Sequence, residues 1–299
     1  MNSFSHTYQS EKPSVSAYDT SMFLLINSQK IATQFVNLFF KDTCEQHTIE
    51  YDYKESIWKI LDSKLDSDGI GHSIKAHTSL ESFLNTDTFT KDVIILIRDP
   101  WERWKSAFHE DFIKNLIDTR QRSGPSSMFY GLTALNASGN TELESWWASN
   151  SEHYMGKYER AITKNEPHYI NGMPNEFFKC MEIITASMVH NYITAGIPVF
   201  WHHNRQYHEV ISNIMLTNKN LNKIKIFDID TVDLNSVFSK YTVGAKNVGY
   251  LNTSKFSKTK FLDRVLEMKP EITERLKSQM RYEILAYQVL SQRAKTQND

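Results

Sequence analysis

An apolar run that ends on an arginine and passes directly into a helical pattern is the feature that most constrains this chain. Residues 93–97 are Val-Ile-Ile-Leu-Ile, which is the pattern of a strand buried on both faces. Arg98 follows, and Asp99 and Pro100 then suit the N-cap and the first position of a helix. We therefore expect a buried strand that delivers Arg98 to the edge of a sheet, and a helix that begins at Pro100.

The helix after Pro100 has an apolar face with a hydroxyl beside it. The apolar residues recur at helical spacing: Trp101, Trp104, Phe108 and Phe112. Ser106 lies off this stripe, about two turns into the helix. A guanidinium at a strand end, next to a helix start and a hydroxyl, can hold a phosphate. The same residues also fit an ordinary helix cap that binds nothing.

Two upstream segments carry further groups that suit an anion. Residues 22–26 form a short apolar strand pattern, a loop with Lys30 follows, and an apolar helix pattern comes next. This order is typical of loops that bind phosphate through helix amides and a lysine. The segment has no glycine, so it is not the GxxxxGK[ST] loop of nucleotide kinases.

The second upstream segment is Lys75-Ala76-His77. Residues two apart in an extended strand point to one side, so the ammonium and the imidazole would lie together. Residues 78–92 are long enough to cross over to a parallel strand. We therefore expect this segment to end a strand that neighbours residues 93–97 in parallel.

These segments together resemble three motifs of the sulfotransferases that use 3′-phosphoadenosine 5′-phosphosulfate (PAPS). The first family motif, PKSGTTW, is similar to residues 29–35, where Lys30 and Thr33 match it. The remaining positions expected to contact the cofactor depart from it: Ile31 stands for serine, Ala32 for glycine, Gln34 for threonine and Phe35 for tryptophan. Alanine is the smallest residue that can stand for a glycine at a close backbone approach.

The second and third motifs add a base and a phosphate clamp. The KTH motif of the cytosolic branch resembles Lys75-Ala76-His77, and the arginine followed eight positions later by serine resembles Arg98 and Ser106. The surrounding RDPxxRxxSxF is similar to the carbohydrate branch. The resemblance implies that His77 is the general base and that Arg98 and Ser106 hold the 3′-phosphate. It also implies roles for the other matched positions: Lys30 stabilises the leaving phosphate, Thr33 donates a hydroxyl, Phe35 stacks on adenine, and Lys75 supports the anionic pocket.

The resemblance also implies a fold and an activity. The fold is a single three-layer α/β domain of the P-loop NTPase-like sulfotransferase type, over residues 21–295, after a flexible lead-in at residues 1–20. Strand candidates at 93–97, 197–201 and 225–227 alternate with helical patterns, which favours a mostly parallel sheet flanked by helices. The activity is sulfuryl transfer from PAPS to a hydroxyl or amine of a small-molecule or glycan acceptor. PAP is the product, and no metal is required.

Two other classes of function agree with the same residues. A kinase or nucleotidase with an atypical phosphate loop would place a magnesium-binding aspartate at a strand end, where Asp99 lies. A non-catalytic relative that binds PAP would tolerate the missing glycine. A sulfuryl-transfer assay separates the second alternative from an enzyme.

Charge and hydropathy limit the classes of partner and the location that we expect for this protein. The net charge of −1 and pI near 6.8 give no reason to expect nucleic acid as a main partner. Residues 183–201 carry no charge, but Gly196 and Pro198 interrupt them, so we expect a buried helix and a short strand and no membrane span. The polar N-terminus lacks the apolar block of a signal peptide, which favours a cytoplasmic location.

Several polar residues lie outside these motifs. The histidines at 202, 203 and 208 lack a carboxylate or cysteine at ligand spacing, so we expect no metal there. Lys255 and Lys258, near the C-terminal end of the chain, can either reach a phosphate or stand at the start of a helix. The residues left open are His202, His203, His208, Lys255 and Lys258. The acceptor and the oligomeric state also stay open.

Overall fold

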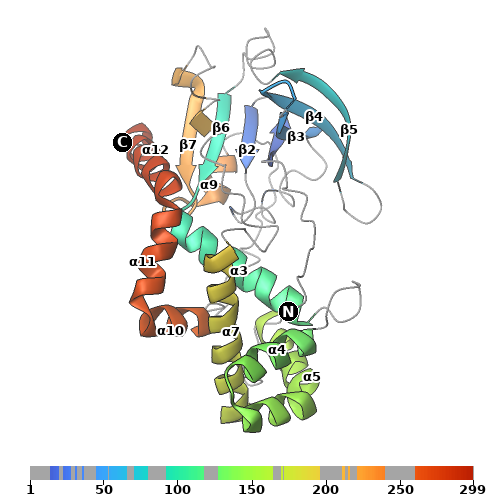
Figure 1. Ribbon diagram of the computed structural model, residues 1–299. Helices are drawn as coiled ribbons and strands as arrows, with labels where there is room; N and C mark the ends of the chain where they lie inside the picture. Colours follow the sequence, from blue (N-terminus) through green and yellow to red (C-terminus); the bar gives the residue numbers. More distant parts are fainter. Residues whose placement is uncertain are drawn as a thin grey trace. The chain divides into compact units, whose positions relative to one another are not determined.

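The protein is represented by a computed structural model that divides into two compact units (Figure 1). It describes residues 14–19, 23–27, 31, 36, 45–52, 54–65, 71–79, 92–117, 127–163, 170, 172–195, 211–212, 215, 221–239 and 260–298. The sheet unit takes in residues 1–100, 204–251 and 280–299. The helical unit takes in residues 101–203 and 252–279. The chain is therefore an α/β protein, and each unit is described separately below.

Seven strands of the described chain form the one sheet of the sheet unit. Their spatial order is β5 (Gly71–Ser79), β4 (Ile57–Leu65), β3 (Glu45–Asp52), β1 (Ser14–Asp19), β2 (Phe23–Asn27), β6 (Asp92–Ile97) and β7 (Ile224–Asp228). β6 pairs in parallel with β2 on one side and with β7 on the other. The other neighbouring strands are antiparallel.

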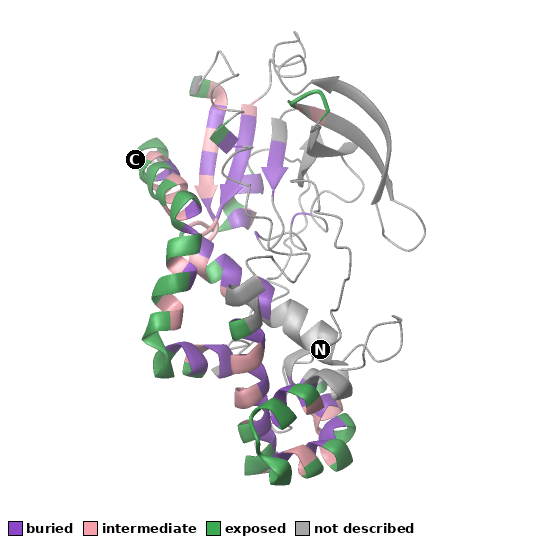
Figure 2. Cartoon of the chain, in the orientation of Figure 1, coloured by how far each residue is buried: buried purple, intermediate pink, exposed green. Residues whose placement is uncertain are grey.

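The strand and helix boundary predicted at Arg98 is confirmed. Residues 93–97 are fully buried in β6, and α3 (Pro100–Ile117) begins at the predicted proline. β7 alternates buried and half-buried residues, with Ile224 and Ile226 in the core. β6 has a strand on both sides, at the centre of the parallel part, and it is buried from Val93 to Ile97, while Asp92 at its start is half-buried (Figure 2).

The prediction of a mostly parallel sheet was wrong, because only β2, β6 and β7 are parallel and the other four strands add an antiparallel part. β5 is not the parallel neighbour of β6, and β2 takes that position. β3 and β4 form an antiparallel hairpin, and Ser56 in the turn between them has a φ of 55°. β1 also lies within residues 1–20, which the sequence suggested were a flexible lead-in.

The C-terminal helix protects the open edge of β7. Residues of α12 (Arg281–Asn298) run beside this strand (Figure 1). The Gln297 side chain accepts a hydrogen bond from the Ile226 N–H at 3.1 Å and donates one to the Ile224 carbonyl at 2.8 Å. One amide thus takes the place of a further strand, which an exposed edge would otherwise attract. The unit also contains the short helices η1 (Leu221–Lys223) and α9 (Leu234–Ser239).

The helical unit packs around a cluster of aromatic rings. Its helices are α3 from its second residue, α4 (Ser127–Ala137), α5 (Thr141–Thr163), α7 (Asn175–Ala195), α10 (Lys260–Met268) and α11 (Pro270–Gln279). The Phe177 ring lies 5.8 Å from that of Tyr158 and 6.5 Å from that of Trp147, measured between centroids. The charge-free segment from residue 183 begins inside α7, as predicted, and residues 196–201 lie outside the described residues. Among the helices described, none is long and apolar enough to cross a membrane.

Candidate functional site at the carboxyl edge of the parallel strands

The parallel pairing brings the carboxyl ends of β2 and β6 to one edge of the sheet. β2 ends at Asn27, three positions before Lys30 in the sequence, and β6 ends at Ile97, directly before Arg98. Ile26 pairs with Ile95 in the register of these two strands. The carboxyl ends of adjacent parallel strands are where ligands bind in open α/β sheets. The strands that precede the first and third motifs in the sequence therefore end at the same edge.

The structure describes only some of the predicted site residues. Ile31 is fully buried, and Arg98 is half-buried at the end of β6. Ser106 is a half-buried residue of α3 and belongs to the helical unit. The other positions of the first motif lie outside the described residues: Lys30, Ala32, Thr33, Gln34 and Phe35. Their contribution to cofactor binding stays a prediction, as does that of Ser106.

The second motif lies on β5, at the other side of the sheet. Lys75 and His77 are within this strand rather than at its end, and Lys75 pairs with Asp62 of β4. Four strands separate β5 from β6, which at ordinary strand spacing is roughly 24 Å along the sheet. Strand adjacency therefore does not bring His77 to Arg98, and its role as a base stays a prediction.

The edge also holds acidic residues that the sequence reading did not assign. Asp228 is the last residue of β7 and is only 2% exposed. Its Oδ2 accepts a hydrogen bond from the Tyr287 hydroxyl of α12 at 2.7 Å, and its Oδ1 accepts one from the Asp230 N–H at 3.1 Å. Burial and this hydrogen bond to Asp228 raise the pKa of Tyr287, so the phenol stays protonated and donates.

Asp230 connects these carboxylates to Arg98. Its Oδ1 lies 3.5 Å from the Arg98 Nε, and the carboxylate also accepts the backbone N–H of Asp99. Burial raises the pKa of Asp230; Arg98 lowers it, and the carboxylates of Asp228 and Asp99 raise it further. The edge thus carries one guanidinium among three aspartates. The signal in the sequence was Asp228-Ile229-Asp230 directly after the predicted strand at 225–227.

A buried amide at the end of β2 has unused hydrogen-bonding capacity. Asn27 is 1% exposed, and among the described residues neither its side-chain nitrogen nor its oxygen has a hydrogen-bond partner. Leaving a buried amide unpaired costs free energy, so such a group is normally satisfied by protein, water or ligand. Asn27 is the last residue of β2, three positions before Lys30 in the sequence, and its side chain offers two N–H donors and one acceptor oxygen.

No cluster of three or more His, Cys, Asp or Glu side chains suited to a metal ion is found in the described part of the chain. Asp228 and Asp230 instead use their oxygens on Tyr287, Arg98 and backbone N–H groups. A phosphotransferase that needs a bound magnesium ion would have to recruit these carboxylates away from those partners.

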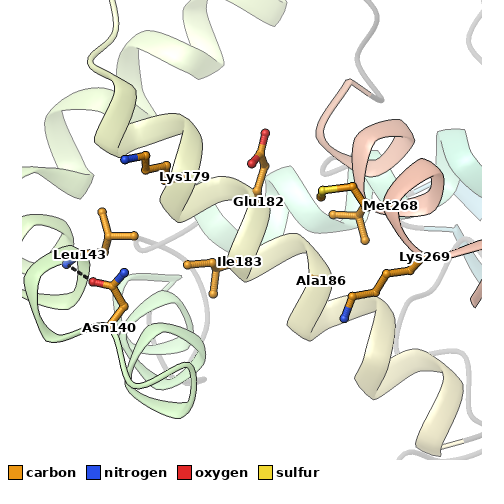
Figure 3. A pocket seen from close by; sticks show the side chains of 9 residues that line it. Asn140, Leu143, Lys179, Glu182, Ile183, Ala186, Met268 and Lys269 are labelled. Carbon is orange, nitrogen blue, oxygen red and sulfur yellow. Dashed lines mark hydrogen bonds between the residues drawn. The ribbon is translucent and has the colours of Figure 1, made fainter.

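The helical unit contains a separate surface groove of about 320 Å³ (Figure 3). Leu143, Ile183 and Met268 give it an apolar lining, and Lys179 and Lys269 add two ammonium groups. Glu182 also lines the groove but forms an ion pair with Arg264 at 2.7 Å. Among the described residues that line this groove, none is a predicted site residue.

Comparison of the chain with protein-family models, with curated proteins and with solved structures found no significant match. The functional interpretation therefore depends on the residues and on the arrangement of the strands.

Proposed function

We propose that this protein binds PAPS at the carboxyl edge of β2 and β6 and transfers its sulfuryl group to a hydroxyl or amine of an acceptor. The observation that carries the proposal is the parallel pairing of β2 with β6. It supports a common binding edge for the loop with Lys30 and for Arg98, which two independent motifs of the resemblance require. The P-loop-like sulfotransferase fold is part of the same proposal.

The proposed reaction assigns each group a definite task. The bond between the sulfur and the phosphate oxygen of PAPS breaks, and a bond from sulfur to the acceptor oxygen or nitrogen forms. The negative charge that develops on the departing phosphate is stabilised by Lys30 and the helix amides that follow it. The acceptor proton passes to a base, a role that the resemblance assigns to His77, although β5 lies four strands away from β2 in the sheet order.

We propose that the Arg98 guanidinium binds the 3′-phosphate. A charge-assisted hydrogen bond contributes about 1.5–3 kcal/mol, so Arg98→Ala is expected to weaken binding of PAP by roughly 10- to 150-fold. Binding of AMP, which has no 3′-phosphate, should change little. Arg264→Ala is a matched control, because it removes a guanidinium that is paired with Glu182 in the helical unit.

The experiment is a thermal-shift screen of the full chain with PAP, PAPS, AMP and ATP with magnesium, because a ligand that binds the folded state raises apparent stability. PAP should give the largest shift, and incubation with PAPS and candidate acceptors should release PAP. A preference for ATP with magnesium would favour the phosphotransferase alternative. Binding of PAP without turnover of PAPS would favour a non-catalytic relative.

A further inference from the structure

Arg98 has an acidic partner at the position where the proposed function requires a phosphate. The Arg98 side chain is 23% exposed and that of Asp230 is 41% exposed, with 3.5 Å between Nε and Oδ1. A partly exposed ion pair at this distance is weak and can exchange partners. A phosphate carries more charge than a carboxylate and can accept two hydrogen bonds from one guanidinium.

The protein holds Asp230 in a fixed turn at the end of β7. The Asp230 N–H donates to the Asp228 side chain, and the Asp230 carboxylate accepts the Asp99 N–H. The backbone carbonyl of Asp228 accepts the N–H groups of Thr231 and Val232 at 3.0 and 3.1 Å. Tyr287 fixes Asp228 in turn through its 2.7 Å hydrogen bond. Asp230 therefore presents its negative charge to Arg98 from a defined position.

We infer that Asp230 is a built-in competitor for Arg98: it occupies the guanidinium when no ligand is bound, and a 3′-phosphate must displace it. This inference rests on the proposed function, because it needs Arg98 to be the phosphate handle. Asp230 opposes binding in two ways. It holds the guanidinium, and its own charge repels the incoming phosphate. It thus sets how tightly the nucleotide is held, and it is a positioning residue that takes no part in bond making.

The electrostatics of the edge link this competition to pH. The charged and titratable groups around Asp230 among the described residues are Arg98, Asp99 and Asp228, with Tyr287 bonded to Asp228. Because burial raises the pKa of Asp230, a mildly acidic solution protonates it more readily than an exposed aspartate. Protonation removes both the ion pair and the repulsion.

The test is calorimetric titration of PAP into the full-length protein and into Asp230→Asn, Arg98→Ala and the double variant. Removing the competing charge is expected to tighten PAP binding roughly three- to tenfold. The double variant should gain less over Arg98→Ala than Asp230→Asn gains over the unmodified protein, because without Arg98 only the repulsion is relieved. Asp230→Ser is a second variant, which also keeps an oxygen as acceptor for the Asp99 N–H.

Asp233→Asn is the matched control, because it removes the same charge three residues away and keeps an oxygen to accept the Asn235 N–H. It should change PAP affinity less than twofold. The gain in PAP affinity from Asp230→Asn should also shrink as the pH falls, because the native aspartate then becomes protonated. Both proteins are compared at the same pH, so the titration of PAP itself cancels.

The outcomes separate the two proposals. If the unmodified protein does not bind PAP, or binds it equally well without Arg98, the proposed function or its phosphate handle fails. If PAP binds through Arg98 but both Asp230 variants bind it equally or more weakly, the competition is refuted. An equal gain from Asp233→Asn would also refute it, since the effect would then be one of general charge.

Discussion

Removal of the Tyr287 hydroxyl tests whether α12 stabilises the candidate site. Asp228 is almost fully buried, and Tyr287 is the partner of its Oδ2 among the described residues. Tyr287→Phe keeps the ring and removes this donor. A hydrogen bond to a charged group contributes about 1.5–3 kcal/mol, so the free energy of unfolding should fall by that amount. This is a large share of a typical total of about 5–15 kcal/mol.

The same helix provides the control for this substitution. Tyr282 is 60% exposed, and its hydroxyl accepts a hydrogen bond from Arg281 at 2.7 Å. Tyr282→Phe removes an equally short bond from the surface, where the expected change is within about 0.5 kcal/mol. Urea denaturation followed by circular dichroism measures both variants.

The contribution of the bond itself follows from a double-mutant cycle with Asp228→Asn, because the two residues are in direct contact. The two substitutions should be clearly non-additive. Equal and small effects of Tyr287→Phe and Tyr282→Phe would refute the reasoning, since the buried carboxylate would then need no donor from α12.

Two further predictions concern packing and pH. Gly131→Ala should destabilise the helical unit by about 1–3 kcal/mol, because the added Cβ would overlap Trp147 Nε1 and lie 2.7 Å from its Cε2. Gly156→Ala, on α5, should instead stabilise by about 0.4–1 kcal/mol, because beyond its chain neighbours and the backbone of its own helix no described atom lies within 4 Å of the new Cβ. Thermal denaturation separates the pair. The folded-state pKa of Asp230 is raised by burial. Its favourable contribution to the free energy of unfolding is therefore present below about pH 4, the ordinary pKa of an aspartate in the unfolded chain, and is lost as the pH rises through the raised pKa. Asp230→Asn should therefore raise the free energy of unfolding at pH 7, and the variant should be stabilised less than the unmodified protein when the pH falls from 7 to 5. Urea midpoints at pH 7 and pH 5 test this. If the variant exceeded the unmodified protein by more at pH 5 than at pH 7, the sign would be wrong.

The central strand and its exit were predictable because their signals are local. A run of β-branched residues, an N-cap aspartate and a proline at the first helical position each act within a few residues of Arg98. The strand at residues 225–227 was found in the same way. These elements agree with the structure because burial and capping point to the same boundary.

The position of β5 was not predictable from the same kind of signal. Side chains along residues 71–79 alternate between the two faces of the sheet in the same way whether the neighbouring strand is parallel or antiparallel. A connection of the length of residues 80–91 can also serve either arrangement. The decisive fact is that β3, β4 and β5 follow one another as antiparallel neighbours. That pairing depends on which strands meet, and the distance of His77 from β6 in the strand order follows from it.

The acidic partner of Arg98 shows why a site is harder to predict than a strand. Arg98 and Asp230 lie far apart in the sequence and become neighbours because β6 and β7 are parallel and end at the same edge. A guanidinium at a strand end is expected both for a phosphate site and for an internal ion pair, so its presence alone cannot distinguish them. The response of PAP binding to loss of Asp230 distinguishes them. If Arg98 serves only the fold, PAP affinity does not rise, whereas an arginine that binds the 3′-phosphate binds it more tightly once the competing carboxylate is gone. The sign of the change in PAP affinity in Asp230→Asn therefore tells which role the strand end has.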